Sequence, residues 1–223
     1  MFFDWSVPIR NLPVLLRGVL ESVWLTLLVF IIAFVIGLLL SLIRFSKKNK
    51  VLYAVATAYV EVIRNTPVLV QIFFIYFGLP QFGILLNPLF AGILALSLNN
   101  AAYISEILRS GIQAVPKGQW EAADSLGLSA YRVFSSVIFP QALRNIFPSL
   151  INQFIMVLFG TSLLTVLDIK ELTQVSSILN SKTFRTMEIF IVATLIYYGV
   201  STLLSAVLRT INKKYFPSLG GRA

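Results

Sequence analysis

The sequence predicts an all-α membrane protein that forms a single domain over residues 1–223, with five transmembrane helices. Of the 223 residues, 57% are hydrophobic and only 12% are charged, a composition too apolar for an ordinary soluble domain. Two stretches, Val23 to Ile43 and Ile189 to Leu208, contain no charged residue. Each reaches the roughly 20 residues that a helix needs to cross the hydrocarbon core. Composition and length therefore predict at least these two spans.

The five spans are predicted over residues 20–43, 51–77, 89–109, 148–167 and 188–209. The first is longer than the apolar core of a cleavable signal, and no small-residue cleavage site follows it before Arg44, so we expect it in the mature protein. The second and third are less uniform, because they contain Glu61, Arg64, Pro67 and Glu106. We nevertheless expect both to cross the membrane.

An odd number of spans places the two termini on opposite sides, and the distribution of lysine and arginine selects the side. With the loop after the first span in the cytoplasm, most basic residues lie inside: Arg44, Lys47, Lys48, Lys50, Arg109, Lys117, Arg132, Arg144, Arg209, Lys213, Lys214 and Arg222. Outside fall Arg10, Arg17, Lys170, Lys182 and Arg185. The N-terminus is therefore predicted outside and the C-terminus in the cytoplasm.

Three segments between the spans carry weaker signals. Residues 2–15 suit the outer membrane interface with Trp5 as an anchor, or form a disordered tail. Turn residues in 78–88 indicate a short external loop. The longer polar segment 168–188 is either a solvated hairpin or a charged surface for a soluble partner.

Several function classes are excluded by composition. The net charge of +9 is accounted for by loops that face anionic lipid headgroups, so we expect membrane lipid rather than nucleic acid as a partner. The chain has no cysteine and no histidine, hence no thiolate or imidazole metal ligand and no Ser-His or Cys-His nucleophile pair. No phosphate-binding loop of the G-x-x-x-x-G-K-[ST] type occurs either. We therefore expect no catalysis, metal or cofactor on this chain, and any nucleotide must be bound by another polypeptide.

A polar interruption from Arg109 to Pro148 separates the third and fourth spans. Residues 118–125 are helix-prone, Gly127 permits a turn with positive φ, and residues 130–137 resume a helix that Pro140 is expected to stop. Apolar residues punctuate both helices, which suits insertion into a groove on a partner protein. The alternative is a free cytoplasmic helical hairpin.

Glu121, Ala122, Ala123, Gly127, Val137, Phe139 and Pro140 reproduce the spacing E-A-A, three residues, G, nine residues, I-x-L-P. In this motif the chain resembles the permease subunits of ATP-binding-cassette (ABC) importers, with Val137 and Phe139 as conservative departures. Residues 64–71 (RNTPVLVQ), 76–80 (YFGLP), 101–103 (AAY) and 109–112 (RSGI) extend the resemblance to the polar amino acid permeases of type I importers.

The resemblance implies a multi-pass permease in the bacterial plasma (inner) membrane. Two such permeases, identical or different, would sit on two ATPase subunits that bind ATP and Mg²⁺, and an extracytoplasmic amino-acid-binding protein would dock outside. The segment 121–140 would then be the coupling helix that transmits ATP-driven motion to the spans. Its coupling residues would be Glu121, Ala122, Ala123, Gly127 and Pro140.

A candidate substrate pathway follows from helical periodicity, since ionisable groups within a bilayer usually face a cavity or each other. On the second span Thr57, Glu61, Arg64, Val68 and Gln71 form one polar stripe, and on the third span Asn99, Tyr103, Glu106 and Ser110 form another. Arg64 and Glu61 could hold the carboxylate and ammonium of an amino acid. The favoured alternative is a structural Glu61–Arg64 pair, and Glu106–Arg109 repeats that spacing as a structural pair or gate.

On the fourth span, Gly160, Thr161 and Ser162 could contact substrate or allow close helix packing, and packing is favoured. Similar permeases carry lysine and aspartate in this stretch, whereas here Phe159 and Gly160 occupy those positions. A basic amino acid is therefore disfavoured, and glutamine, glutamate, cystine or another polar amino acid remain open. The rival class is an ion-coupled secondary transporter or channel without an ATPase, which would show inverted repeats and discontinuous spans.

Overall fold

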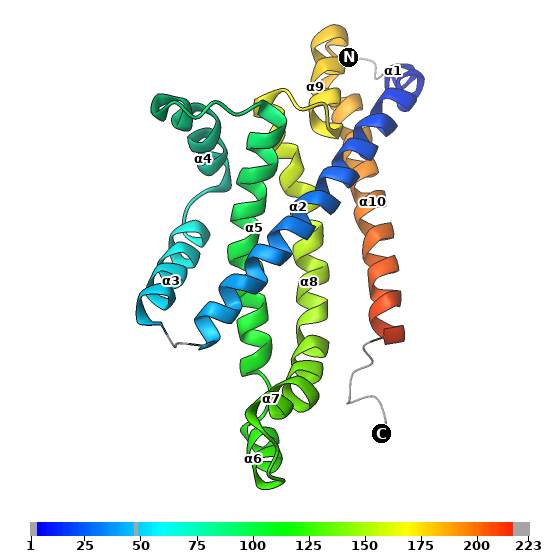
Figure 1. Cartoon of the computed structure of the whole chain (residues 1–223). Coiled ribbons are helices and arrows are strands. Elements are labelled where there is room, and N and C mark those ends of the chain that lie inside the picture. The colour runs from blue at the N-terminus through cyan, green and yellow to red at the C-terminus, as the bar shows by residue number, and fades with distance from the viewer. Residues whose placement is uncertain (1–3, 47–48, 216–223) are drawn as a thin grey trace.

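The computed structural model describes residues 4–46 and 49–215, and this part of the chain is helical without strands (Figure 1). Lys47, Lys48, Arg222 and the first residues of the expected interfacial segment lie outside the described residues. The first described helix lies at one end of the bundle, and the last described helix ends at the other. The α-helices are α1 (Ser6–Arg10), α2 (Leu12–Ser46), α3 (Lys50–Arg64), α4 (Val68–Phe73), α5 (Pro88–Gln113), α6 (Lys117–Ser125), α7 (Ala130–Arg132), α8 (Phe139–Thr161), α9 (Leu172–Thr183) and α10 (Thr186–Tyr215).

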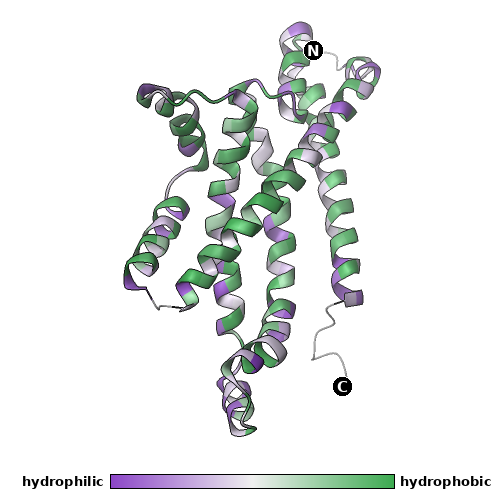
Figure 2. Ribbon diagram, in the orientation of Figure 1, coloured by the Kyte–Doolittle hydropathy of each residue, from purple (hydrophilic) through white to green (hydrophobic). Residues whose placement is uncertain are grey.

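Four described helices are long and apolar enough to cross a membrane, or five if the bent pair α3 and α4 is one span. In Figure 2 the hydrophobic residues occupy the middle of the bundle, and hydrophilic residues gather towards its two ends and on α6. This agrees with the predicted all-α membrane protein. The helices are longer than the predicted spans, because α2, α8 and α10 continue beyond the apolar core into the polar ends of the molecule.

The centre of the fold is the crossing of α2 over α5 (Figure 1). The buried face of α2 repeats at helical spacing and is rich in small residues, among them Gly18, Ala33, Gly37 and Ser41. A Cβ at Gly37 would lie 2.9 Å from the carbonyl oxygen of Ala101 on α5. Only glycine therefore lets the two backbones approach so closely, as is typical of helix pairs in membranes.

The second predicted span is broken. Helix α3 ends at Arg64, the chain turns through Asn65–Pro67, and the helical segment that starts at Val68 is inclined to α3 by 110°. Pro67 explains the position of the break, because it cannot donate a backbone hydrogen bond and pushes the preceding residue out of helical geometry. The single span over residues 51–77 is thus corrected to two helical pieces, the second continuing through a π-helix (Phe74–Gly78) and a 3₁₀-helix (Leu79–Phe82).

The segment 168–188 folds onto the bundle, so of the two alternatives left open there the solvated hairpin is wrong. Its helix α9 packs on α2, where a Cβ at Gly18 would lie 2.9 Å from Leu172 Cα. Glu171 caps α9 by accepting hydrogen bonds from the amides of Thr173 and Gln174, and it also accepts one from the hydroxyl of Tyr197 at 2.7 Å. Burial raises the pKa of this fully buried carboxyl.

Candidate functional site

A hairpin formed by residues 117–138 projects from one end of the bundle (Figure 1). Its first arm is α6, which ends where Gly127 adopts a left-handed conformation with φ +70°. The Gly127 amide donates to the Asp124 carbonyl at 2.9 Å, and the Leu128 amide donates to the Ala123 carbonyl at 3.4 Å. This pair of bonds is a Schellman motif, which ends a helix at a glycine. The predicted bend at Gly127 is confirmed.

The hairpin has a small hydrophobic core of its own. Ala123 is 3% exposed and packs with Val133 and Ile138 from the returning arm and with Ala142 in the first turns of α8. Trp120 and Leu128 close this cluster at its edge. The short alanine side chain lets α6 lie close against the returning arm, so the hairpin is a folded unit rather than a loose loop.

Pro140 does not stop the returning arm, contrary to the sequence prediction. The helix runs on from α7 through a π-helix (Val133–Ile138) into α8, and Pro140 lies in the first turn of α8. The Phe139 amide bonds to the Phe134 carbonyl five residues earlier. A proline is tolerated at such a position, because the first turn of a helix needs no backbone donor there. The fourth span is therefore helically continuous with the returning arm of the hairpin.

The outer face of the hairpin carries apolar side chains that the bundle leaves uncovered. Leu126 is 78% exposed and Tyr131 is 79% exposed. Glu121 and Ala122 are exposed as well, and the Glu121 carbonyl accepts a hydrogen bond from Ser125 Oγ. A large exposed leucine and tyrosine beside a carboxylate form the kind of surface that docks into a partner.

Towards the middle of the bundle, the two predicted polar stripes meet. Asn99 on α5 donates to the Gln71 side chain on α4 at 3.1 Å. Tyr103 donates to the Arg64 carbonyl at 3.4 Å, and its ring lies beneath the Arg64 guanidinium, 5.5 Å from the ring centroid. The structure therefore brings Arg64, Gln71, Asn99 and Tyr103 together at the break in the second span.

Glu61 does not join this group. It is exposed, and within residues 4–46 and 49–215 it makes no ion pair. The favoured Glu61–Arg64 pair is wrong, since Arg64 turns towards Glu106 on α5, with 3.9 Å between Nη1 and Oε2. The end of helix α3 at Arg64 explains the difference, because it lets this side chain reach the neighbouring helix.

Glu106 is the hub of an arginine cluster that joins three helices. Its carboxylate accepts a hydrogen bond from Arg44 of α2 at 3.0 Å, pairs with Arg64 of α3 and is bound by Arg109 one turn further along α5. The expected Glu106–Arg109 pair is confirmed. Three guanidinium groups around one carboxylate leave a net positive charge, which suits a site that holds or passes an anionic group.

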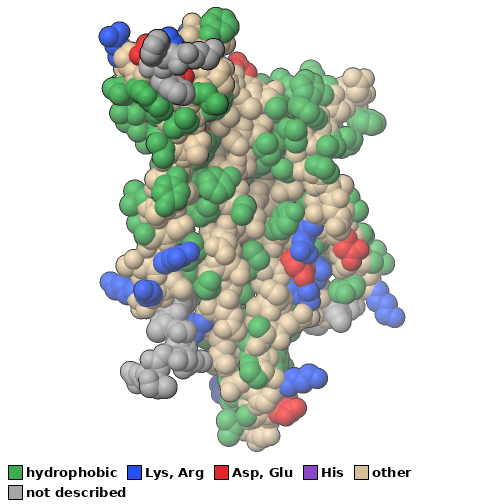
Figure 3. Space-filling model, turned by 180° about the vertical axis from the view of Figure 1, so that it is seen from behind, with side chains coloured by type: hydrophobic (Ala, Val, Ile, Leu, Met, Phe, Trp, Pro, Cys, Tyr) green, Lys and Arg blue, Asp and Glu red, His purple; other side chains and the backbone are tan. Residues whose placement is uncertain are grey.

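Figure 3 shows oppositely charged side chains next to one another in the lower half of the rear face. Hydrophobic side chains lie above and around them.

The residues of the fourth-span stretch mainly pack. Thr161 is fully buried and donates to the Leu158 carbonyl, while Ser162 donates to the Phe159 carbonyl. A Cβ at Gly160 would meet only a methyl of Leu96, at 3.7 Å. No hydrogen bond in the described part of the chain links these residues to the polar group around Asn99.

Two polar contacts of the bundle were missed by sequence reasoning. Gln153 on α8 donates to Asn100 on α5 at 2.6 Å, and the Tyr59 hydroxyl of α3 donates to the Leu98 carbonyl of α5 at 2.7 Å. An amide residue in the middle of an apolar span is the signal that could have indicated Gln153, because such groups commonly bond across helices.

Comparisons with known proteins agree with this architecture. The family model described as "Binding-protein-dependent transport system inner membrane component" matches residues 33–217. The chain is 35% identical over 213 residues to the probable amino-acid ABC transporter permease protein YckA of Bacillus subtilis (strain 168), covering 96% of this chain and 94% of YckA. It is also 35% identical over 216 residues to the glutamine transport system permease protein GlnP of Escherichia coli (strain K12), covering 96% and 98% of the two chains.

A solved structure is similar over nearly the whole length. The crystal structure described as an amino acid ABC transporter with histidines superposes with a TM-score of 0.91 at 38% identity, covering 96% of this chain and all of that one. The chain belongs to the family of inner membrane components of binding-protein-dependent transport systems, as a multi-pass membrane protein.

Proposed function

We propose that this member of the family is the permease subunit of an ABC importer that moves a polar amino acid into the cytoplasm. The hairpin would insert into a separate ATPase and couple ATP hydrolysis there to transport. The observation that carries this proposal is a folded hairpin that presents Leu126 and Tyr131 to solvent beyond the end of the bundle. The amino acid class is supported by the names of the similar permeases.

The geometry suits mechanical coupling. The hairpin is continuous with α8, and Phe134 packs against Phe45 at the end of α2 with ring centroids 5.6 Å apart. A Cβ at Gly111 on α5 would lie 1.9 Å from Ile146 Cγ2 on α8, so α5 and α8 are in tight contact just above the hairpin. A displacement of the hairpin is thereby passed to α2, α5 and α8 together, because closely packed helices move as units.

We further propose how the permease is oriented in the membrane and which proteins bind it. The hairpin and the end of α10 face the cytoplasm, the N-terminus faces outside, and an amino-acid-binding protein docks at the end with α1 and α9. A second permease, identical or different, completes the pathway. The chain itself is not an enzyme, since ATP and Mg²⁺ are bound by the ATPase subunits.

The substrate pathway is proposed to run past the break in the second span. Arg64, Gln71, Asn99 and Tyr103 gather there, and the cluster around Glu106 lies on the same face of α5 towards the hairpin. The unpaired carboxylate of Glu61 is available to a substrate ammonium group. Gly160, Thr161 and Ser162 would shape the pathway by packing rather than by binding.

The docking step is tested by co-purification of the ATPase with the permease. Leu126→Asp places a charge on the exposed hairpin face without disturbing a core, and we expect it to abolish ATPase retention. Leu85→Asp is the matched control, because Leu85 is 83% exposed between the 3₁₀-helix Leu79–Phe82 and α5, away from the hairpin. Full ATPase retention by Leu126→Asp would contradict hairpin docking.

One observation favours the rival function, an ion-coupled transporter that works without an ATPase. The broken span between α3 and α4 resembles the discontinuous helices of such transporters. The two functions are separated by uptake into proteoliposomes that hold the permease alone. Uptake driven by a proton or sodium gradient without ATPase would establish the rival function.

A further inference from the structure

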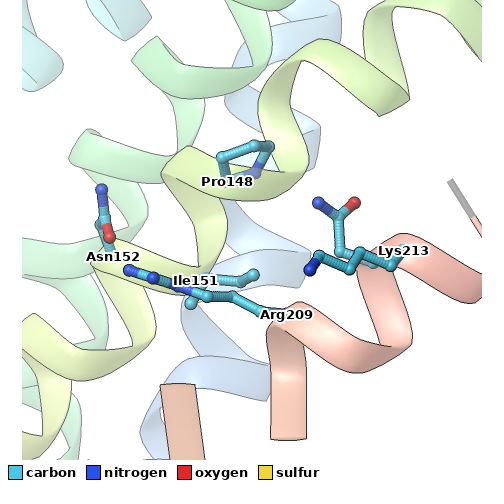
Figure 4. A pocket seen from close by; sticks show the side chains of 6 residues that line it. Pro148, Ile151, Asn152, Arg209 and Lys213 are labelled. Carbon is cyan, nitrogen blue, oxygen red and sulfur yellow. The ribbon is translucent and has the colours of Figure 1, made fainter. Parts of the chain in front are cut away.

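A pocket lined mostly by polar residues lies between α8 and α10, on the other side of the bundle from α3 and α4. It has a volume of about 310 Å³ and is lined by Pro148, Ile151, Asn152, Arg209, Asn212 and Lys213. In Figure 4 the Arg209 side chain runs across the pocket towards Asn152, and Lys213 points into it from the next turn of α10. The proposed transport function uses none of these residues.

The charges in this pocket are not balanced by the described residues. Arg209 and Lys213 are one helical turn apart, so their side chains share a face of α10. Neither forms an ion pair within residues 4–46 and 49–215, and the pocket lining contains no carboxylate. The pocket therefore has two positive charges and a preference for an anion.

A third polar group points to a ligand with hydroxyl groups. The Asn212 side-chain oxygen is buried and has no hydrogen-bond partner in the described part of the chain. A buried acceptor without a donor is unfavourable, so a bound donor would stabilise it. A phosphate group with a neighbouring hydroxyl would satisfy the two cations and this oxygen at once.

The surroundings favour a lipid over a soluble anion. The pocket lies within the last two turns of a membrane-crossing helix. Leu195 and Tyr198 lie within about 40° of Arg209 around α10. These apolar side chains, on the same side of the helix as the pocket, are 62% and 69% exposed. Acyl chains could follow this apolar face while the headgroup enters the pocket. Basic pockets between transmembrane helices near the membrane surface bind anionic lipid headgroups in this way.

We propose that the pocket between α8 and α10 binds the phosphodiester headgroup of an anionic phospholipid. Arg209 and Lys213 hold the phosphate, Asn152 donates a further hydrogen bond, and Asn212 accepts one from a headgroup hydroxyl. The lipid is held in the leaflet at the hairpin end of the molecule. It braces α10 against α8.

Native mass spectrometry of the purified full-length chain tests this site by titration with phosphatidylglycerol or phosphatidylcholine. The wild type should bind one phosphatidylglycerol per chain more tightly than phosphatidylcholine. Arg209→Gln with Lys213→Gln should weaken phosphatidylglycerol binding about 30-fold, from about fivefold for each basic side chain near an anionic headgroup. Lys50→Gln with Lys214→Gln removes the same charge from residues outside the pocket and should change binding less than about twofold.

A charge-preserving variant guards against a folding defect. Arg209→Lys with Lys213→Arg should retain selective binding, whereas loss of binding in this variant would show that charge is not the determinant. Equal binding of both lipids by the wild type, as expected if a second copy covers the pocket, overturns the proposal. Inorganic phosphate that binds as tightly as the lipid would identify a soluble-anion site and overturn it as well.

Discussion

Substitution of Gly127 by alanine isolates the backbone requirement of the hairpin. Gly127 has φ +70°, a conformation that costs a residue with a Cβ about 1–2 kcal/mol. A Cβ at this position would meet no atom within 4 Å, so no steric clash adds to this energy. Gly118→Ala is the matched control in the same hairpin. A Cβ at Gly118 would also meet no atom within 4 Å, but this residue lies within α6, where alanine is favoured over glycine by about 1 kcal/mol.

Hydrogen exchange of the Leu126 and Leu128 amides measures this difference. The Leu126 amide makes the last regular helical bond, to the Ala122 carbonyl, and the Leu128 amide bonds across the turn to the Ala123 carbonyl. A loss of about 1–2 kcal/mol from local stability should accelerate their exchange about 5- to 30-fold in Gly127→Ala. Gly118→Ala should leave exchange unchanged or slower. Equal exchange rates in the two variants would refute the argument that the left-handed turn is needed.

The same position should matter for coupling. Gly127→Val should leave the permease in the membrane but uncouple transport from ATP hydrolysis, because the strained turn no longer holds α6 against the returning arm. The measurement is substrate uptake per ATP hydrolysed in proteoliposomes. An unchanged ratio would show that transport does not depend on the bend.

Three further predictions concern the bundle. Gly111→Ala should destabilise the protein by about 1–3 kcal/mol through its clash with Ile146, and adding Ile146→Ala should restore part of the thermal stability that Gly111→Ala removes. Glu106→Gln should lower thermal stability by about 1–3 kcal/mol, since it leaves three arginines without their common carboxylate, and an unchanged melting temperature would contradict the hub. Burial raises the pKa of Glu171 above its value in the unfolded chain, so the stability contributed by the protonated carboxyl is lost as the pH rises through the folded-state pKa. Glu171→Gln should make the melting temperature less dependent on pH over that range.

The sequence was most informative where local chemistry decides structure. The glycine after α6 and the helix-prone residues around it predict the turn, because a Schellman motif depends on neighbouring residues alone. Pro140 was misjudged because its effect depends on more than its neighbouring residues. A proline usually ends a helix, but here the preceding π-helix, which depends on packing in the hairpin core, lets the helix continue.

The polar groups of the bundle were predicted only in part. Helical periodicity placed Asn99 and Tyr103 on the face of α5 that meets the second span, since this follows from spacing. The approach of Arg44 to Glu106 joins residues far apart in the chain, so spacing could not indicate it. Likewise, Pro67 marked the break in the second span, but the 110° bend depends on how both pieces pack against α5.

ATPase activity of the reconstituted complex tests the central claim most directly. The full importer, with two permeases, two ATPases and the amino-acid-binding protein, is measured with and without a polar amino acid. We predict that the loaded binding protein stimulates ATP hydrolysis and that Leu126→Asp in the hairpin abolishes this stimulation. If hydrolysis never responds to the loaded binding protein, or if Leu126→Asp leaves the response unchanged, the hairpin is not the coupling element.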